Sequence, residues 1–385
     1  MRTQTIFAAA LVLIASACNA GTNQSVPPIA AGPGVAGAVD EVQPNVDHTS
    51  VLKLLTVQQT IGSTVDPKNG DQNPYGLVYV ANKPYGKSLL KKGDLVICNF
   101  NDKANVQGNG TTIDYISSVP GSKPSQLAQS SSLKGCASEG INQFDNIYAA
   151  NSGAQDDIGV TDLGKIVQTL SNKLLVEPFG SVYVPSKLGY PPGDGIWVAD
   201  ASSGNIIRIN LGTQSGKPTY TAVITGFAVN HGKPGSILGP SGLQYNVHTD
   251  TLYVVDGVTN TLVSFAHAYN SFNGANQVKV SSDGKSFSGP LAKDAKLIYS
   301  DGMLNGPISS TLLPNGNLVL GNTLGKAGKN LLVEIATDGT LLGYKNVDKG
   351  AAGALFGIAS SGSSDDTTQI YFNDDNKNTV ELLKK

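Results

Sequence analysis

The sequence is poor in charged and aromatic side chains. Of its 385 residues, 15% are charged and 6% are aromatic, and the formal net charge is −2. There is no run of Lys or Arg, so we expect no nucleic-acid partner. Helical periodicity is hard to find after residue 50, which favours an all-β fold.

Familiar catalytic motifs are also missing. The sequence contains no Gly-x-Ser-x-Gly, His-Glu-x-x-His or Cys-x-x-Cys pattern, no phosphate-binding loop and no haem attachment motif. Histidines are few, at His48, His231, His248 and His267, and their contexts are typical of surface histidines. A His-dependent hydrolase would need one of them beside its ligand.

What the sequence does contain is a repeat. Six short apolar runs each end on a small polar residue, and successive ends lie 49 to 66 residues apart, at Asn99, Asn151, Asp200, Asp256, Asn322 and Asn373. Each run has the length and the β-branched or aromatic content of a buried strand, and turn residues bound it. A period of this size indicates an array of similar units.

Each unit reads as a small antiparallel sheet. A turn and a second apolar strand follow each run, and a strand with a Pro-x-Gly opening precedes most of them, as at Pro178–Gly180 and Pro240–Gly242. Such sheets must pack face to face, so we predict a six-bladed β-propeller of four-stranded blades over residues 47–385. The last unit offers three strands, and residues 50–58 are expected to supply its fourth.

Residues 1–20 have the features of an export signal. Met1 and Arg2 precede an apolar stretch and the small residues 15–17. The sequence around Cys18 resembles the lipobox of bacterial lipoproteins, with Ala15 where Leu is usual. Lipidation of Cys18 would anchor the protein in a membrane, in the outer membrane or periplasm, and ordinary cleavage would secrete it. Residues 21–46 are rich in Gly and Pro and read as a flexible tether.

Two cysteines remain, Cys98 and Cys136. In an exported protein an even pair is a disulfide candidate. Cys98 lies in a second strand of the first unit and Cys136 near the first strand of the next, so a bridge would join adjacent blades. The alternative is two buried free thiols.

The pairing of Pro240–Leu243 with the Leu252–Asp256 strand resembles the NHL-repeat propellers. Residues 73–113 are similar to a group of uncharacterised exported bacterial proteins. The second unit departs from the NHL pattern, because it lacks a clear Pro-x-Gly opening. The resemblance implies the propeller fold, and such propellers include protein-binding, carbohydrate-binding and enzymatic members.

The six polar strand ends have a simple interpretation. A short polar side chain beside a hairpin accepts backbone N–H groups of the turn, so we interpret all six as turn caps. Asp374–Asn378 and Asp156–Asp162 have oxygen-rich spacing, but they lack the Gly and the distal Glu of a calcium loop.

Candidate ligand residues lie where the first strands begin, because these strands should line the central channel. They are Asn73, Tyr75, Glu139, Glu177, Phe179, Ser241 and Asn305. In the lactonase-type propellers a Glu, Asn and Asp cluster holds a divalent metal. That resemblance implies a metal, possible as calcium, at Asn73, Glu139, Glu177 and Asn305, with Glu177 the best candidate. The Glu-Gly-Pro opening of the gluconolactonase relatives is absent.

Two functions therefore remain open. The first is a non-enzymatic, monomeric propeller that binds a protein, a glycan or a small ligand through its loop face. The second is a metal-dependent lactonase or related hydrolase with its cation in the channel. We favour the first, because no complete ligand set can be read from the sequence.

Overall fold

The computed structural model describes residues 46–84, 86–186, 194–212 and 217–385. The predicted export signal, Cys18 and all but the last residue of the predicted tether lie outside these ranges. Within them, no helix is both long and apolar enough to cross a membrane. Residues 45–385 form one compact unit.

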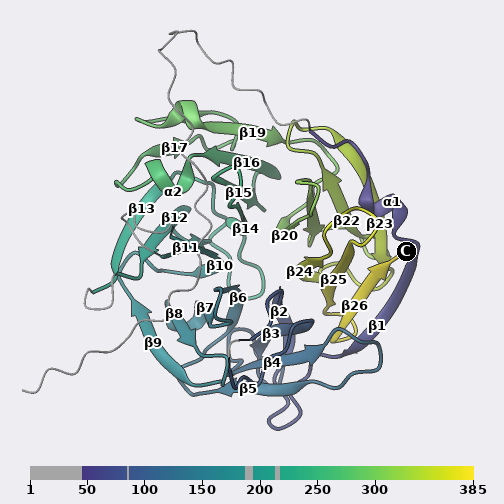
Figure 1. The fold of residues 1–385 in the computed structure, drawn as a ribbon. Coiled ribbons are helices and arrows are strands. Elements are labelled where there is room, and N and C mark those ends of the chain that lie inside the picture. The colour runs from purple at the N-terminus through teal and green to yellow at the C-terminus, as the bar shows by residue number, and fades with distance from the viewer. Residues whose placement is uncertain (1–45, 85, 187–193, 213–216) are drawn as a thin grey trace, which may run out of the picture. The chain divides into compact units, whose positions relative to one another are not determined.

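The unit is a ring of six antiparallel blades, as predicted (Figure 1). Blade 1 consists of β2 (Gln72–Tyr79), β3 (Asp94–Asn101), β4 (Thr112–Ser117) and β5 (Ser125–Gln129). Blade 2 consists of β6 (Cys136–Ile141), β7 (Ile147–Asn151), β8 (Asp156–Val160) and β9 (Ile166–Ser171), with a 3₁₀ turn at Ser152–Ala154. Blade 3 begins with β10 (Pro178–Val184), β11 (Gly195–Asp200), β12 (Asn205–Asn210) and β13 (Thr219–Thr225).

The remaining blades repeat this order. Blade 4 consists of β14 (Pro240–Asn246), β15 (Thr251–Asp256), β16 (Thr261–Ala266) and β19 (Ala295–Tyr299). Blade 5 consists of β20 (Pro307–Leu312), β21 (Leu318–Asn322), β22 (Asn330–Ile335) and β23 (Leu341–Asp348). Blade 6 consists of β24 (Leu355–Ser361), β25 (Gln369–Asp374), β26 (Thr379–Lys384) and the N-terminal β1 (Val57–Ser63).

The two ends of the ring close on each other in blade 6. Strand β1 pairs antiparallel with β26, from Val57 opposite Lys384 to Ser63 opposite Thr379. This confirms the predicted closure, with one correction to its position. The first part of the expected strand is a short helix, α1 (Val51–Leu54), whose N-cap is Ser50. The strand starts at Val57 because the preceding residues dock on blade 5 instead.

An insertion in blade 4 explains the longest interval in the repeat, between Asp256 and Asn322. Between β16 and β19 the chain forms α2 (Ala268–Ser271), β17 (Val278–Val280), β18 (Phe287–Ser288) and a 3₁₀ turn (Ala292–Asp294). Strand β17 pairs in parallel with β13, so the sheet of blade 3 has six strands. This insertion covers Trp197, which is buried in the core between blades 3 and 4, as expected.

The cores lie between blades. Ile97 of blade 1, for example, packs in one cluster with Tyr371 and Leu382 of blade 6. The predicted disulfide is also confirmed: it joins Cys98 of β3 to Cys136 of β6, with the two Cα atoms 5.2 Å apart. Blades 1 and 2 are therefore held together by a covalent bond as well as by apolar packing.

Candidate functional site

The first strand of every blade lines the centre of the ring. Strands β2, β6, β10, β14, β20 and β24 together enclose a cavity of about 300 Å³. Much of its wall is Gly, Ser and Thr, because neighbouring strands converge there. A Cβ atom on Gly180, for example, would overlap the carbonyl oxygen of Ser241 in the next blade. The Pro-x-Gly opening seen in the sequence is thus a requirement of close packing around the channel.

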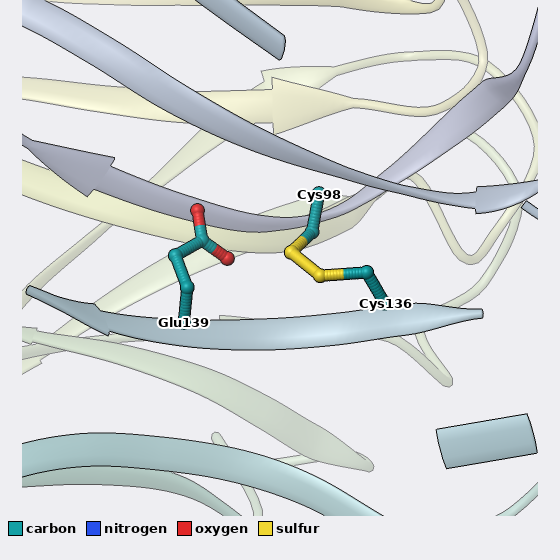
Figure 2. Close-up of side chains that lie close together, drawn as sticks. All are labelled: Cys98, Cys136 and Glu139. Atoms are coloured by element: carbon teal, nitrogen blue, oxygen red, sulfur yellow. A yellow bond between two sulfur atoms is a disulfide. The ribbon is translucent and has the colours of Figure 1, made fainter. Parts of the chain in front are cut away.

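Glu139 is the one acidic residue in the wall of this channel. It is 6% exposed, and neither carboxyl oxygen has a hydrogen-bond partner among the described residues. Burial raises the pKa of Glu139 well above its usual value, because the carboxylate would lose its water. Figure 2 shows its side chain beside the Cys98–Cys136 disulfide.

These three residues are the only close group of His, Cys, Asp and Glu ligands within the described ranges. Both sulfur atoms are bonded to each other, so neither can act as a thiolate ligand. Glu139 therefore offers the single available ligand of this group.

A second cavity, of about 210 Å³, lies at the end of the channel where the first strands begin. We call it the aromatic pocket. Tyr75 is stacked between Phe100, at 4.1 Å between ring centroids, and Phe356, at 4.0 Å. Phe179 contacts Tyr75 edge-on at 5.8 Å. Its wall is completed by Glu177, Asn230, Gly235, Ser236, Ile237, Leu238, Ile308, Thr323 and Leu324.

The aromatic rings serve both roles that the sequence left open. Tyr75, Phe179 and Phe356 pack on each other and are only 6 to 8% exposed. They also form part of the wall of both cavities. The recurrence of an aromatic residue at this point in three blades thus builds an apolar floor between the channel and the pocket.

Glu177 contributes the one carboxylate of the aromatic pocket. Its Oε1 accepts a hydrogen bond of 2.6 Å from the Ser152 hydroxyl. Its backbone is fixed because its N–H donates to Asp200 Oδ2 at 2.8 Å and its carbonyl accepts the N–H of Ala201. Burial raises the pKa of Glu177, the Ser152 hydrogen bond opposes that shift, and the charge of Asp200 adds to it.

The other predicted site residues have local partners. The Asn73 N–H donates to Asn378 Oδ1 at 2.9 Å, and its buried Oδ1 has no partner among the described residues. Ser241 lies in the channel wall and donates to the Gly239 carbonyl at 2.9 Å. Asn305 is exposed, and its N–H donates to Asn322 Oδ1 at 3.0 Å.

The four proposed metal ligands have different surroundings. Glu139 lines the channel and Glu177 the aromatic pocket, whereas Asn73 and Asn305 line neither cavity. Calcium takes about six to eight oxygen ligands. Glu139 and Asn73 have oxygens without partners, but the residues around them do not form an oxygen-rich set of that size among those described here.

The polar strand ends act as turn caps in two blades. Asp200 accepts the N–H of Ser203 at 2.8 Å, and Asp256 accepts that of Val258 at 2.9 Å. Turn capping does not describe the other four in the same way. Asn151 and Asn322 accept N–H groups from the loop before their blade's first strand, at Lys134 and Asn305. Asn99 donates to Asp114, and Asn373 to the carbonyls of Pro74 and Gly76.

Sequence reasoning missed several residues of the aromatic pocket. Phe100 follows Asn99 directly, and its place at a strand end was a usable signal. Ile237 and Leu238 belong to an irregular loop, and Leu324 to another, so no periodicity marked them. None of the four histidines lines either cavity.

Solved structures with a similar fold include proteins of several activities. A Bacteroides thetaiotaomicron protein of unknown function aligns with a TM-score of 0.53 at 11% identity, covering 85% of this chain and 75% of that one. A gluconolactonase from Xanthomonas campestris aligns at 0.52 and 13% identity, over 82% and 87%. This chain shares their propeller fold. Virginiamycin B lyase from Staphylococcus aureus aligns at 0.50 and 15% identity, over 86% and 99%.

At these identities the likeness shows the fold alone. The resemblance to six-bladed propellers noted in the sequence is therefore confirmed for architecture. No protein-family model matches the sequence, and no curated protein matches it.

Proposed function

We propose that this protein is an exported, non-enzymatic propeller that binds a small, largely apolar ligand in the aromatic pocket. The observation that carries the proposal is the pocket itself, a concave site of about 210 Å³ with aromatic and aliphatic walls and one carboxylate. Concave apolar sites with a few polar groups are the usual form of small-molecule sites. Its volume is below the roughly 300 to 1,000 Å³ of drug-sized sites, so we expect a compact ligand.

The composition of the wall favours binding over catalysis. Its described residues include Glu177 but no His, Cys, Lys or Arg. General acid–base catalysis usually needs a second group of matched pKa, and covalent catalysis needs an activated nucleophile. Ser236 and Thr323 supply hydroxyls, but neither has a histidine partner.

A blocked pocket tests this proposal. Leu324 is 52% exposed at the pocket, so Leu324→Trp should obstruct it without disturbing the core. Leu163 is 55% exposed and lies outside both cavities, so Leu163→Trp is the matched control. We expect small apolar fragments to raise the Tm of the wild type and the control but not of Leu324→Trp. Equal shifts in all three proteins, or no binding to any, would reject the pocket as the ligand site.

A metal-dependent lactonase is the second candidate. The observation in its favour is Glu139, a buried carboxyl without a partner in the channel wall. If calcium binds, its removal by a chelator should lower the Tm, calcium should restore it, and Glu139→Gln should abolish the difference. Lactone hydrolysis that depends on the same cation would favour this candidate over simple binding.

Export and anchoring belong to the same proposal. We propose that Cys18 carries a lipid that holds the protein at a membrane, and that the propeller acts as a monomer. Labelled fatty acid should be incorporated into the wild type and lost in Cys18→Ala. A labelled Cys18→Ala variant would contradict the anchor, and an unlabelled, exported wild type would indicate free secretion.

A further inference from the structure

The aromatic pocket has the chemistry of a site for organic cations. Three kinds of observation bear on this: the faces and edges of its aromatic rings, the charges around it, and the absence of a cation from its described wall. The inference rests on the proposed function, because it names the class of ligand for the same pocket.

Aromatic rings are concentrated at the floor of this pocket. Tyr75, Phe100, Phe179 and Phe356 all belong to its wall. The negative face of an aromatic ring attracts a cation, and alkylated ammonium groups are recognised in this way. Ile237 and Leu324 add aliphatic surface, which suits the methyl groups of such a cation.

The charge near the pocket is negative. Glu177 lies in the wall, and the charge of Asp200 acts on its carboxyl group. Asp375, from the turn after β25, acts electrostatically on the Tyr75 hydroxyl. The nearby Lys377 has its own partners, Asp374 and Asp348, the latter at 3.3 Å.

The partly desolvated carboxylate has room for a positive partner. Ser152 supplies one neutral hydrogen bond to Glu177, and no described residue forms an ion pair with it. A half-buried carboxylate without a counterion loses solvation, and a cationic ligand would restore the balance of charge.

We propose that the aromatic pocket binds a small organic cation, a quaternary or alkylated ammonium compound, with Glu177 as its counterion and the aromatic floor against its methyl groups. An ammonium nitrogen without N–H groups still gains from the carboxylate by charge alone. A purely apolar ligand would leave the carboxylate desolvated and unpaired. The pocket therefore discriminates by charge among ligands of one shape.

Two probes of the same shape test the inference. Choline and 3,3-dimethylbutan-1-ol differ only by nitrogen and its charge in place of carbon. Isothermal titration should show choline binding about tenfold or more tightly, which corresponds to an ordinary cation–π and ion-pair contribution. Glu177→Gln should reduce choline affinity to that of the alcohol and leave the alcohol unchanged.

The outcomes separate this inference from the proposed function. If the alcohol binds as tightly as choline, the site is a general apolar pocket and the cation inference is wrong. If neither probe binds the wild type, the charge inference is rejected, and the fragment test with Leu324→Trp decides the proposed function on its own. Glu177→Asp, which keeps the charge, should retain part of the preference, and circular dichroism should show that each variant is folded.

Discussion

The Ser50 hydroxyl donates a hydrogen bond of 2.7 Å to Glu334, 284 residues further along the chain. The same carboxylate accepts the N–H groups of Val51 and Leu52, both at 2.9 Å. Three donors from the first turn of α1 thus converge on one buried side chain of β22. This contact fixes the N-terminal segment on blade 5 just before β1 completes blade 6.

Glu334→Gln should weaken the closure of the ring. Glutamine has one acceptor oxygen, and its amide would face backbone N–H donors, so at least one of the three hydrogen bonds is lost. We expect a loss of about 1 to 3 kcal/mol in the free energy of unfolding. Urea denaturation measures it, with the exposed Asp366→Asn as control, since Asp366 is 86% exposed. Equal stability of the two variants would contradict this role for Glu334.

The Cys98–Cys136 disulfide should contribute measurably to stability. It closes a loop across 38 residues between two blades. We expect the double variant Cys98→Ala/Cys136→Ala to lose about 2 to 4 kcal/mol. Reductant should lower the denaturation midpoint of the wild type but leave that of the variant unchanged. A midpoint of the wild type that does not respond to full reduction would show that packing alone holds the blades.

Gly180 should not tolerate a side chain. A methyl group there would overlap the Ser241 carbonyl oxygen of the neighbouring strand β14. We expect Gly180→Ala to cost about 1 to 3 kcal/mol through displacement of these strands. Gly302 is the matched control, because a Cβ atom there meets nothing within 4 Å. If both alanine variants unfold at the same temperature, the strands around the channel are less tightly packed than the structure indicates.

Asp157 should make stability depend on pH. Burial, together with the neighbouring Asp156, raises the pKa of Asp157 to about 8, although a hydrogen bond from Ser181 opposes the shift. The folded state therefore favours the protonated form. Its contribution to stability is complete below the unfolded pKa near 4, and is lost as pH rises through about 8.

Asp157→Asn removes this titration. Denaturation midpoints at pH 5 and pH 9 should show the wild type losing more stability than the variant over that interval. The comparison uses the change with pH, so any constant effect of the amide cancels. Parallel pH dependence in the two proteins would mean that Asp157 is ionised in the folded state.

The sequence by itself determined the six-bladed architecture, the pairing of Cys98 with Cys136 and the closure of the last blade from the N-terminus. Strand periodicity and turn residues are local signals, and the repeat multiplies them six times. The extent of the closing strand was less certain from sequence, because the packing of Val51 and Leu52 against blade 5 overrides the extended pattern there.

Only the tertiary structure decided the site. Tyr75, Phe179 and Phe356 were visible as recurrent aromatics, but their stacking into one floor depends on the radius of the ring. Glu177 and Glu139 looked equivalent at strand beginnings, yet one lines the aromatic pocket and the other lies beside a disulfide in the channel wall. A bulge or a loop of a few residues changes the direction of a side chain. The sequence pattern carries the order of the strands, whereas the direction of each loop side chain depends on contacts between residues far apart in the chain.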